Sequence, residues 1–184
     1  MTDDADRLPE VIDEAVTLGR ALRARGWMVA TAESCTGGAI ARALTEVDGA
    51  SQWFERGFVT YSNQSKIELL GVSADTLAAA GAVSEAVAAQ MAGGALAHSR
   101  AQLALAVTGI AGPTGARPDK PVGTVCFGWA AIGAAPVTET RQFAGDRAAV
   151  RRAAALHALR GAHRLLPAGP SGAAPTDDGP NTNN

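Results

Sequence analysis

The sequence has little of several residue types on which specialised proteins depend. Among its 184 residues are only two cysteines, Cys35 and Cys126, which lie far apart and provide neither a disulfide framework nor a metal site. Sixteen basic and eighteen acidic residues give a net charge of −2, without the basic excess of a dedicated nucleic-acid-binding protein. No apolar run approaches the ~20 residues that span a bilayer, and the acidic N-terminus is the reverse of a presequence. We therefore expect a soluble cytoplasmic protein without nucleic-acid or membrane partners.

Aromatic residues are scarce as well. The chain has 8 aromatic residues against 41 alanines and 21 glycines, although 47% of it is hydrophobic. This composition predicts a core of closely packed small side chains rather than a large aromatic core. The length suits one domain, which we place at residues 1–166. Residues 167–184 contain mostly Pro, Gly, Ala, Ser, Asp and Asn without apolar spacing, and we expect a disordered C-terminal tail there.

Strand-like and helix-like segments alternate along the domain. Apolar runs predict strands over residues 27–32, 57–62, 103–108, 123–131 and 137–143, with helices between the first strands and a last helix over 147–165. The connection between the last two strands is too short for a parallel crossover, so we expect that pair to be antiparallel. This pattern indicates a single α/β domain, a three-layer α/β/α arrangement with a mixed, roughly five-stranded sheet.

A serine follows the first predicted strand and precedes a glycine-rich turn into a helix. Such a turn directs several backbone N–H groups to one spot, and a hydroxyl there can attack a carbonyl whose oxyanion meets those amides. This reading makes Ser34 a candidate nucleophile, with the amides of Cys35, Thr36, Gly37 and Gly38 as donors. Ser34 or Thr36 as a plain helix cap is the simpler alternative. The Cys35 thiol is a rival nucleophile, or else a buried structural side chain.

A nucleophilic serine needs a base, and the histidines do not provide one. His98, His157 and His163 all fall within or at the end of predicted helices rather than at a strand end. Lysine, unlike arginine, can lose its proton when desolvated, and the chain has only two lysines against fourteen arginines. Lys66 follows the predicted strand 57–62, so we place it and the only tyrosine, Tyr61, at a strand end where active-site groups gather.

Two further segments suggest a bound anion or ligand. Thr108 and Gly109 follow a strand and open a glycine loop that lets a ligand approach the backbone, although the loop is not a nucleotide-binding P-loop. Asp146 is placed to cap the last helix, which puts Arg147 in the first turn, where the helix dipole disfavours a cation unless an anion is bound. A solvated arginine is the alternative. We assign Arg151 and Arg152 to a solvated helical face.

Six short motifs occur together and in a fixed order. They are TAESCTGG at 31–38, GFVTYSN at 57–63, GAVSE at 81–85, GIAGP at 109–113, KPVGTV at 120–125 and GDR at 145–147. In this combination the sequence closely resembles the CinA C-terminal-domain family, from about residue 8 to 165. Stand-alone members of that family are nicotinamide-nucleotide amidohydrolases. The resemblance implies hydrolysis of the carboxamide of nicotinamide mononucleotide to nicotinate mononucleotide and ammonia, within pyridine-nucleotide recycling.

The same resemblance implies roles for individual residues. It makes Ser34 the nucleophile and Lys66 its base, with Tyr61 beside them, and it requires neither a metal nor a cofactor. Thr108 and Arg147 match positions associated with substrate binding or catalysis.

The resemblance says less about the roles of other positions. Glu33 and Lys120 lie in matching motifs, and the resemblance makes Lys120 a substrate contact. Ala116 departs from the family pattern, which often has a second glycine after residues 114–115.

Two other functions remain open at this point. One is an amidase of another substrate that uses Cys35, and the other is a non-catalytic nucleotide-binding module. A homodimer would be ordinary for an α/β enzyme of this size.

Overall fold

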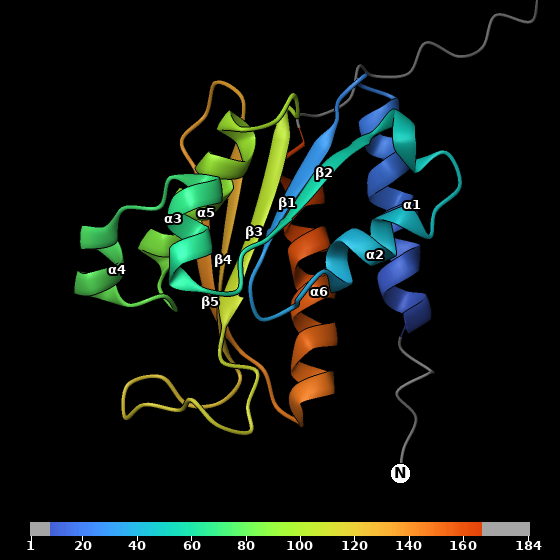
Figure 1. Ribbon diagram of the computed structural model, residues 1–184. Coiled ribbons are helices and arrows are strands. Elements are labelled where there is room, and N and C mark those ends of the chain that lie inside the picture. Colours follow the sequence, from blue (N-terminus) through green and yellow to red (C-terminus); the bar gives the residue numbers. More distant parts are fainter. Residues whose placement is uncertain (1–7, 167–184) are drawn as a thin grey trace, which may run out of the picture.

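A computed structural model describes residues 8–166 of the chain, so the tail expected at 167–184 lies outside the described residues. The first three strands are each preceded by one or more helices, and the segment ends in two further strands and a long helix (Figure 1). In chain order the elements are α1 (Leu8–Arg23), β1 (Val29–Glu33), α2 (Ala39–Thr45), a 3₁₀ turn (Ala50–Gln52), β2 (Phe54–Val59), α3 (Asn63–Leu70), α4 (Ala74–Ala80), α5 (Glu85–Ala97), β3 (Leu103–Gly109), β4 (Thr124–Ala131), β5 (Val137–Gln142) and α6 (Arg147–Arg164).

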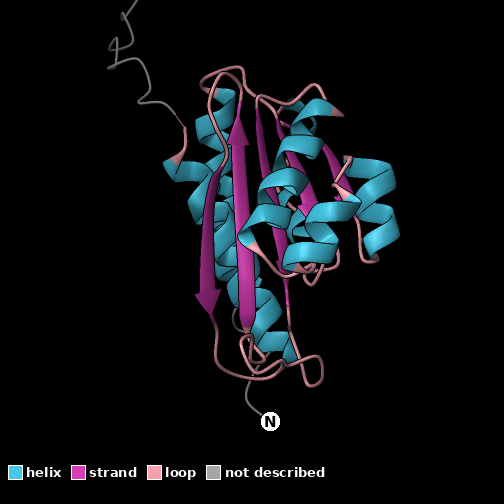
Figure 2. Cartoon of the chain, turned by 90° about the vertical axis from the view of Figure 1, so that its left-hand side faces the viewer, coloured by secondary structure: helices cyan, strands magenta, loops and turns pink. Residues whose placement is uncertain are grey.

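The five strands form one mixed sheet in the order β2-β1-β3-β4-β5. β1 runs parallel to both β2 and β3, whereas β4 is antiparallel to β3 and to β5. Helices α1, α2 and α6 cover one face and α3, α4 and α5 the other, the face seen in Figure 2. The three-layer α/β domain, the mixed sheet and the antiparallel last pair are thus confirmed.

The two faces of the sheet pack differently. Side chains toward α1 and α6 include the large Leu105, Phe127 and Trp129. Those toward α5 are mainly alanines of β1, β3 and β4, together with Met91 from the helix. Helix α5 approaches so closely that a Cβ on Gly128 would lie 2.3 Å from a backbone oxygen of α5. The abundance of small residues therefore serves close helix–sheet packing, as the composition predicted.

Two strands differ from the sequence prediction by more than one residue, whereas the other three differ by a single residue at one end. The first strand begins at Val29 rather than at residue 27, and it extends to Glu33. The second spans Phe54–Val59 instead of 57–62. β2 is an edge strand with mostly part-exposed residues, so its first half lacks the apolar pattern that reveals a buried strand.

Candidate active site

The carboxyl ends of three parallel strands meet at the lower end of the sheet in Figure 1. Ser34 directly follows β1, and its backbone N–H donates to the Val107 carbonyl of β3 over 2.9 Å. Thr60 directly follows β2, and its N–H donates to the Glu33 carbonyl over 2.8 Å. The chain leaves β1 toward β2 on one side and later returns as β3 on the other, and such a switch point opens a crevice at the strand ends.

Ser34 and Lys66 meet in this crevice. The Lys66 ammonium nitrogen lies 3.1 Å from the Ser34 hydroxyl oxygen and 2.8 Å from the Thr60 carbonyl oxygen, to which it donates. Lys66 is only 1% exposed and Ser34 only 8%. The nucleophile and base expected from the sequence are therefore in direct contact.

Lys66 reaches the crevice from a helix that begins just past the end of β2. Helix α3 begins at Asn63, after the Ser62 side chain caps it by accepting the N–H of Ser65. Lys66 lies one turn into α3 and its side chain points inward. Because α3 is packed over the carboxyl ends of the strands, the long lysine side chain spans the distance from helix to serine.

Burial shifts the pKa of the Lys66 amine and the pKa of the neighbouring Cys35 thiol in opposite directions. Burial lowers the pKa of the Lys66 amine, opposed only weakly by the charge of a Cys35 thiolate. Burial raises the pKa of the neighbouring Cys35 thiol to about 12. At neutral pH the thiol is therefore protonated, and the lowered pKa favours the neutral amine more than in a free lysine. Ser34 is the better candidate nucleophile because the amine contacts its hydroxyl oxygen over 3.1 Å.

The turn after Ser34 offers fewer free amides than the sequence suggested. The Gly37 N–H donates to the Ser34 carbonyl over 3.1 Å, and the Gly38 N–H donates to the Glu33 carboxylate over 2.9 Å. Both amides are therefore occupied within the chain, and the geometry does not support the prediction that they bind a substrate oxyanion. Within residues 8–166, the amides of Cys35 and Thr36 donate to no other residue, and the Cys35 amide contacts only its own thiol.

Arg147 and Tyr61 form a second polar group. As predicted, the Asp146 side chain caps α6 by accepting the Ala149 N–H over 2.8 Å. Arg147 then donates to the Gly112 carbonyl over 3.0 Å and to the Tyr61 hydroxyl over 3.2 Å. Tyr61 is 64% exposed, and in the described part of the chain its hydroxyl bonds to Arg147 and not to the Ser34–Lys66 pair.

Arg151 also belongs to this end of the molecule, contrary to its assignment to a solvated face. Its guanidinium donates to the Thr36 carbonyl over 2.7 Å, so α6 supports the turn that carries Ser34. Arg151 lies four residues after Arg147, and residues at that spacing share a helix face. That spacing is the sequence signal that could have identified it.

Lys120 lines a neighbouring groove, and Thr108 contacts Ala82, another residue of its lining. The Thr108 hydroxyl donates to the Ala82 carbonyl over 2.8 Å, and Lys120 donates to the Ala80 carbonyl over 3.1 Å. At Gly109 a Cβ would lie only 2.9 Å from the Thr124 carbonyl oxygen, so a larger residue does not fit.

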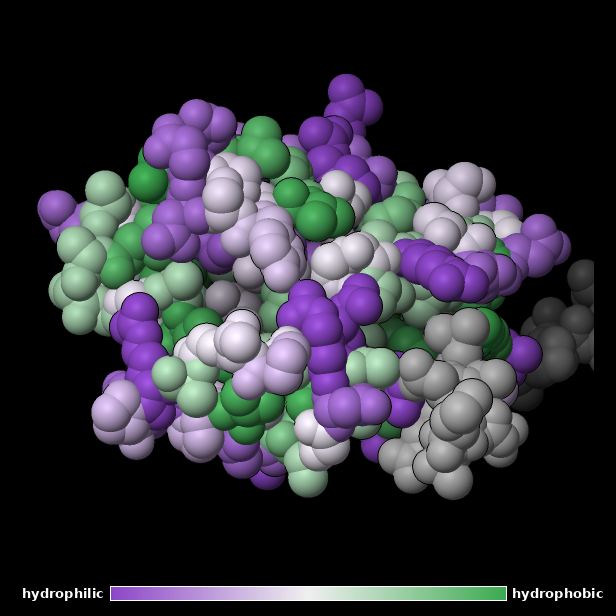
Figure 3. Space-filling model, turned by 60° about the horizontal axis from the view of Figure 1, so that its bottom comes forward, coloured by the Kyte–Doolittle hydropathy of each residue, from purple (hydrophilic) through white to green (hydrophobic). Residues whose placement is uncertain are grey.

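The groove has a volume of about 640 Å³ and runs past Asn63, residues 77–82, Arg117 and Lys120. It begins close to the crevice, because Ala82 contacts Thr108 and Thr108 follows Val107, the partner of Ser34. Figure 3 shows this end of the molecule with hydrophilic side chains near its centre.

Residues 8–166 contain neither a candidate membrane-spanning helix nor a candidate metal-binding cluster. No helix there is both long and apolar enough to cross a membrane. No group of three or more His, Cys, Asp or Glu side chains in the same segment is arranged to hold a metal ion.

Comparisons with known proteins agree with the geometry. Residues 12–166 match the family model of the CinA C-terminal domain. The chain is 55% identical over 150 residues to the nicotinamide-nucleotide amidohydrolase PncC of Enterobacter agglomerans, covering 82% of this chain and 92% of that protein. It is 51% identical over 151 residues to the PncC of Escherichia coli K12, with the same coverage.

Solved structures show the same relationship. The crystal structure of the competence/damage inducible protein CihA from Agrobacterium tumefaciens superimposes with a TM-score of 0.83 at 44% identity, covering 85% of this chain and 95% of that one. The competence damage-inducible protein A from Klebsiella pneumoniae gives a TM-score of 0.81 at 41% identity, covering 85% and 96%. The chain belongs to the CinA C-terminal domain family.

Proposed function

We propose that this protein is a nicotinamide-nucleotide amidohydrolase that converts nicotinamide mononucleotide and water to nicotinate mononucleotide and ammonia. The observation that carries the mechanism is the 3.1 Å contact between the Lys66 amine and the Ser34 hydroxyl, both buried at the strand ends. About half of the residues are identical to those of curated enzymes named for this activity.

In the first step, neutral Lys66 accepts the Ser34 proton as the serine oxygen attacks the carboxamide carbon. A serine hydroxyl is too weak an acid to react without such a base. The pyridinium ring of the substrate is itself cationic, and its approach further favours the neutral amine. The amides of Cys35 and Thr36 stabilise the oxyanion of the tetrahedral intermediate.

The second half of the reaction reverses the roles of the same groups. Protonated Lys66 donates its proton to the departing nitrogen, and ammonia leaves an acyl ester on Ser34. Lys66 then takes a proton from water, whose oxygen attacks the ester carbon, and it returns this proton to the Ser34 oxygen as the ester bond breaks and nicotinate mononucleotide is released. General acid–base catalysis of this kind contributes about 10²–10⁴-fold to the rate.

The nucleotide part of the substrate lies along the groove next to the crevice. Its phosphate is bound by cationic side chains at the rim, with Arg147 as the leading contact and Lys120 on the opposite side. Tyr61 orients Arg147 through the 3.2 Å hydrogen bond, and Thr108 and Gly109 form the wall between the reacting carboxamide and the ribose. The proposal includes a cytoplasmic location, a possible homodimer and a small-molecule substrate.

An ammonia-release assay on the purified protein tests this function. Nicotinamide mononucleotide is supplied with a metal chelator, and product formation is followed by chromatography. The parent protein is expected to release ammonia and nicotinate mononucleotide in equal amounts, and Ser34→Ala to release neither while it keeps the parent's circular dichroism spectrum. Nucleotide binding without ammonia release by the parent would instead indicate a non-catalytic binding module. Turnover by Ser34→Ala near the parent's rate would refute the mechanism.

A further inference from the structure

Glu33 is a completely buried carboxylate immediately before the nucleophile, and the mechanism above gives it no part. One carboxylate oxygen accepts the N–H groups of Gly38 and Ile40, over 2.9 and 3.1 Å, and the other accepts that of Ala41 over 2.8 Å. Within residues 8–166 it has no cationic partner. A buried carboxylate is retained only where such donors compensate its lost hydration.

These three bonds use the N–H groups that open α2. The first N–H groups of a helix have no intrahelical acceptor and are usually capped by the residue just before the helix. Here the residue in that position is Gly38, which has no side chain to act as a cap. Glu33 caps the helix instead, from the strand on the other side of the turn.

The position of this cap determines which amides remain free. Glu33 and Gly38 are joined across the turn, so residues 34–37 form a loop closed at its base by a carboxylate hydrogen bond. Within that loop Ser34 and Gly37 donate to carbonyls, and Cys35 and Thr36 donate to no other residue of the described chain. The two free amides are consecutive and directly follow the nucleophile.

We propose that Glu33 is a positioning residue for the Ser34 nucleophile. Its carboxylate holds the α2 amides and thereby fixes the turn so that the Cys35 and Thr36 amides alone face the developing oxyanion. The inference rests on the proposed function, because it assigns a role within the same amide hydrolysis.

The first test compares the kinetics of two Glu33 variants with those of the parent protein. Glu33→Gln keeps the shape but presents an NH₂ group to at least one N–H donor, and Glu33→Asp keeps the charge on a shorter side chain. We expect kcat to fall about 10²-fold in Glu33→Gln, as for loss of an oxyanion donor, with KM within threefold of the parent. The kcat of Glu33→Asp is expected to lie between that of the parent and that of Glu33→Gln.

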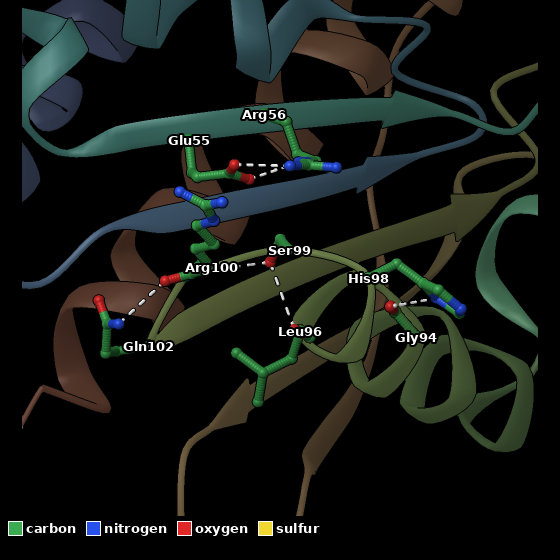
Figure 4. Close-up of polar contacts among 9 residues, drawn as sticks. Glu55, Arg56, Gly94, Leu96, His98, Ser99, Arg100 and Gln102 are labelled. Carbon is green, nitrogen blue, oxygen red and sulfur yellow. Dashed lines mark hydrogen bonds and ion pairs between the residues drawn. The ribbon is translucent and has the colours of Figure 1, made fainter.

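The chain offers a matched control at the other end of the same strand. The Gln102 side chain accepts the Met28 N–H over 2.8 Å, just before β1, and donates to the Arg100 carbonyl over 2.9 Å, a contact drawn in Figure 4. Gln102→Ala is expected to lower the melting temperature and to leave kcat within twofold of the parent. If Glu33→Gln behaves in the same way, Glu33 is only a structural cap and the inference is overturned.

A measurement on the parent protein does not depend on whether a variant folds. Amide hydrogen exchange, followed by NMR, is expected to protect Gly38, Ile40 and Ala41 and to leave Cys35 and Thr36 much less protected. Equal protection of both sets would overturn the inference even if every Glu33 variant is insoluble. The outcome for the proposed function stays separate, since an inactive parent protein, or an active Ser34→Ala variant, refutes that function whatever Glu33 does.

Discussion

The Lys66 amine lies 3.1 Å from the Ser34 hydroxyl, although 32 positions separate the two residues in sequence and they come from different elements. The amine also donates to the Thr60 carbonyl, and in the described chain no carboxylate forms an ion pair with it. A buried ammonium group without a counter-ion is costly. Burial therefore favours the neutral form of the Lys66 amine relative to a free lysine. The fold holds this amine next to the Ser34 hydroxyl that we propose it deprotonates.

The cost of burying Lys66 makes stability depend on pH. Because the folded-state pKa is lowered, the unfolded chain binds more protons between that value and the ordinary lysine pKa of ~10.4. Stability of the parent therefore rises with pH across this window and is reduced below it. Lys66→Met removes the titrating group, so its melting temperature is expected to lack this rise. Melting curves from pH 6.5 to 10 compare the two proteins.

Lys66→Arg is the matched control for that experiment. It keeps the positive charge but cannot release its proton in the accessible pH range. We expect both variants to lose about 10²–10⁴-fold in turnover, with Lys66→Arg the less stable of the two at neutral pH. A Lys66→Met variant that repeats the parent's pH dependence of melting would show that this amine is not its source.

The rate is expected to follow the same titration. Only the neutral amine accepts the serine proton, so kcat/KM should decrease tenfold per pH unit below the folded-state pKa of Lys66. The lowered pKa places the midpoint of this acid limb below ~10.4. Rates measured from pH 5.5 to 10 in buffers of constant ionic strength give the midpoint. A rate independent of pH throughout this range would contradict a lysine base.

Much of the site could be foreseen from local sequence, and the exceptions have physical causes. Ser34 directly follows a strand and precedes glycines, which is a local pattern. The contact with Lys66 depends on the sheet order, because β2 has to lie beside β1 to bring α3 over the turn. Strand order is a long-range property that periodicity does not encode. The family resemblance, rather than the pattern, connected the two residues.

The errors at the site arise from contacts that the local sequence pattern does not reveal. Gly37 and Gly38 look like free donors in the sequence, yet one is bonded to Ser34 and the other to Glu33. A glutamate at the end of a strand gives no local sign that it caps the following helix. Arg151 was misassigned for the same reason, because its partner Thr36 is 115 positions away.

The Cys35 side chain is expected to contribute little to the chemistry. Burial raises its pKa to about 12, so almost no thiolate exists at neutral pH. Cys35→Ala should therefore lower kcat less than tenfold, since it keeps the backbone amide of that position. Iodoacetamide at pH 7.5 should inactivate the parent only slowly. Rapid inactivation, together with an inactive Cys35→Ala variant and an active Ser34→Ala variant, would instead support an amidase that uses Cys35 as its nucleophile.

Arg147 and Lys120 can be tested with a substrate that lacks the phosphate. A charge-assisted hydrogen bond contributes roughly 1.5–3 kcal/mol, equivalent to about 10–100-fold in kcat/KM. Arg147→Ala should lower kcat/KM for nicotinamide mononucleotide by that factor and leave the rate with nicotinamide riboside within threefold. Lys120→Ala should show a smaller loss of the same kind. An equal loss with both substrates would place the residue at the carboxamide rather than at the phosphate.

Arg151 supports the nucleophile turn from α6, through a 2.7 Å bond to the Thr36 carbonyl. Arg151→Leu removes one of the two donors to this carbonyl, which still accepts the Ala39 N–H over 3.2 Å, and the lost hydrogen bond to a charged group costs about 1.5–3 kcal/mol in stability. Because Thr36 carries one of the two free amides, we expect kcat to fall about tenfold, with KM nearly unchanged. Arg160 is the control, since it lies farther along α6 and pairs at the surface with Glu14 over 3.4 Å. Arg160→Ala should cost no more than about 1 kcal/mol and keep the parent's kcat. If Arg151→Leu loses stability but no turnover, the turn is held by Glu33 without help from α6.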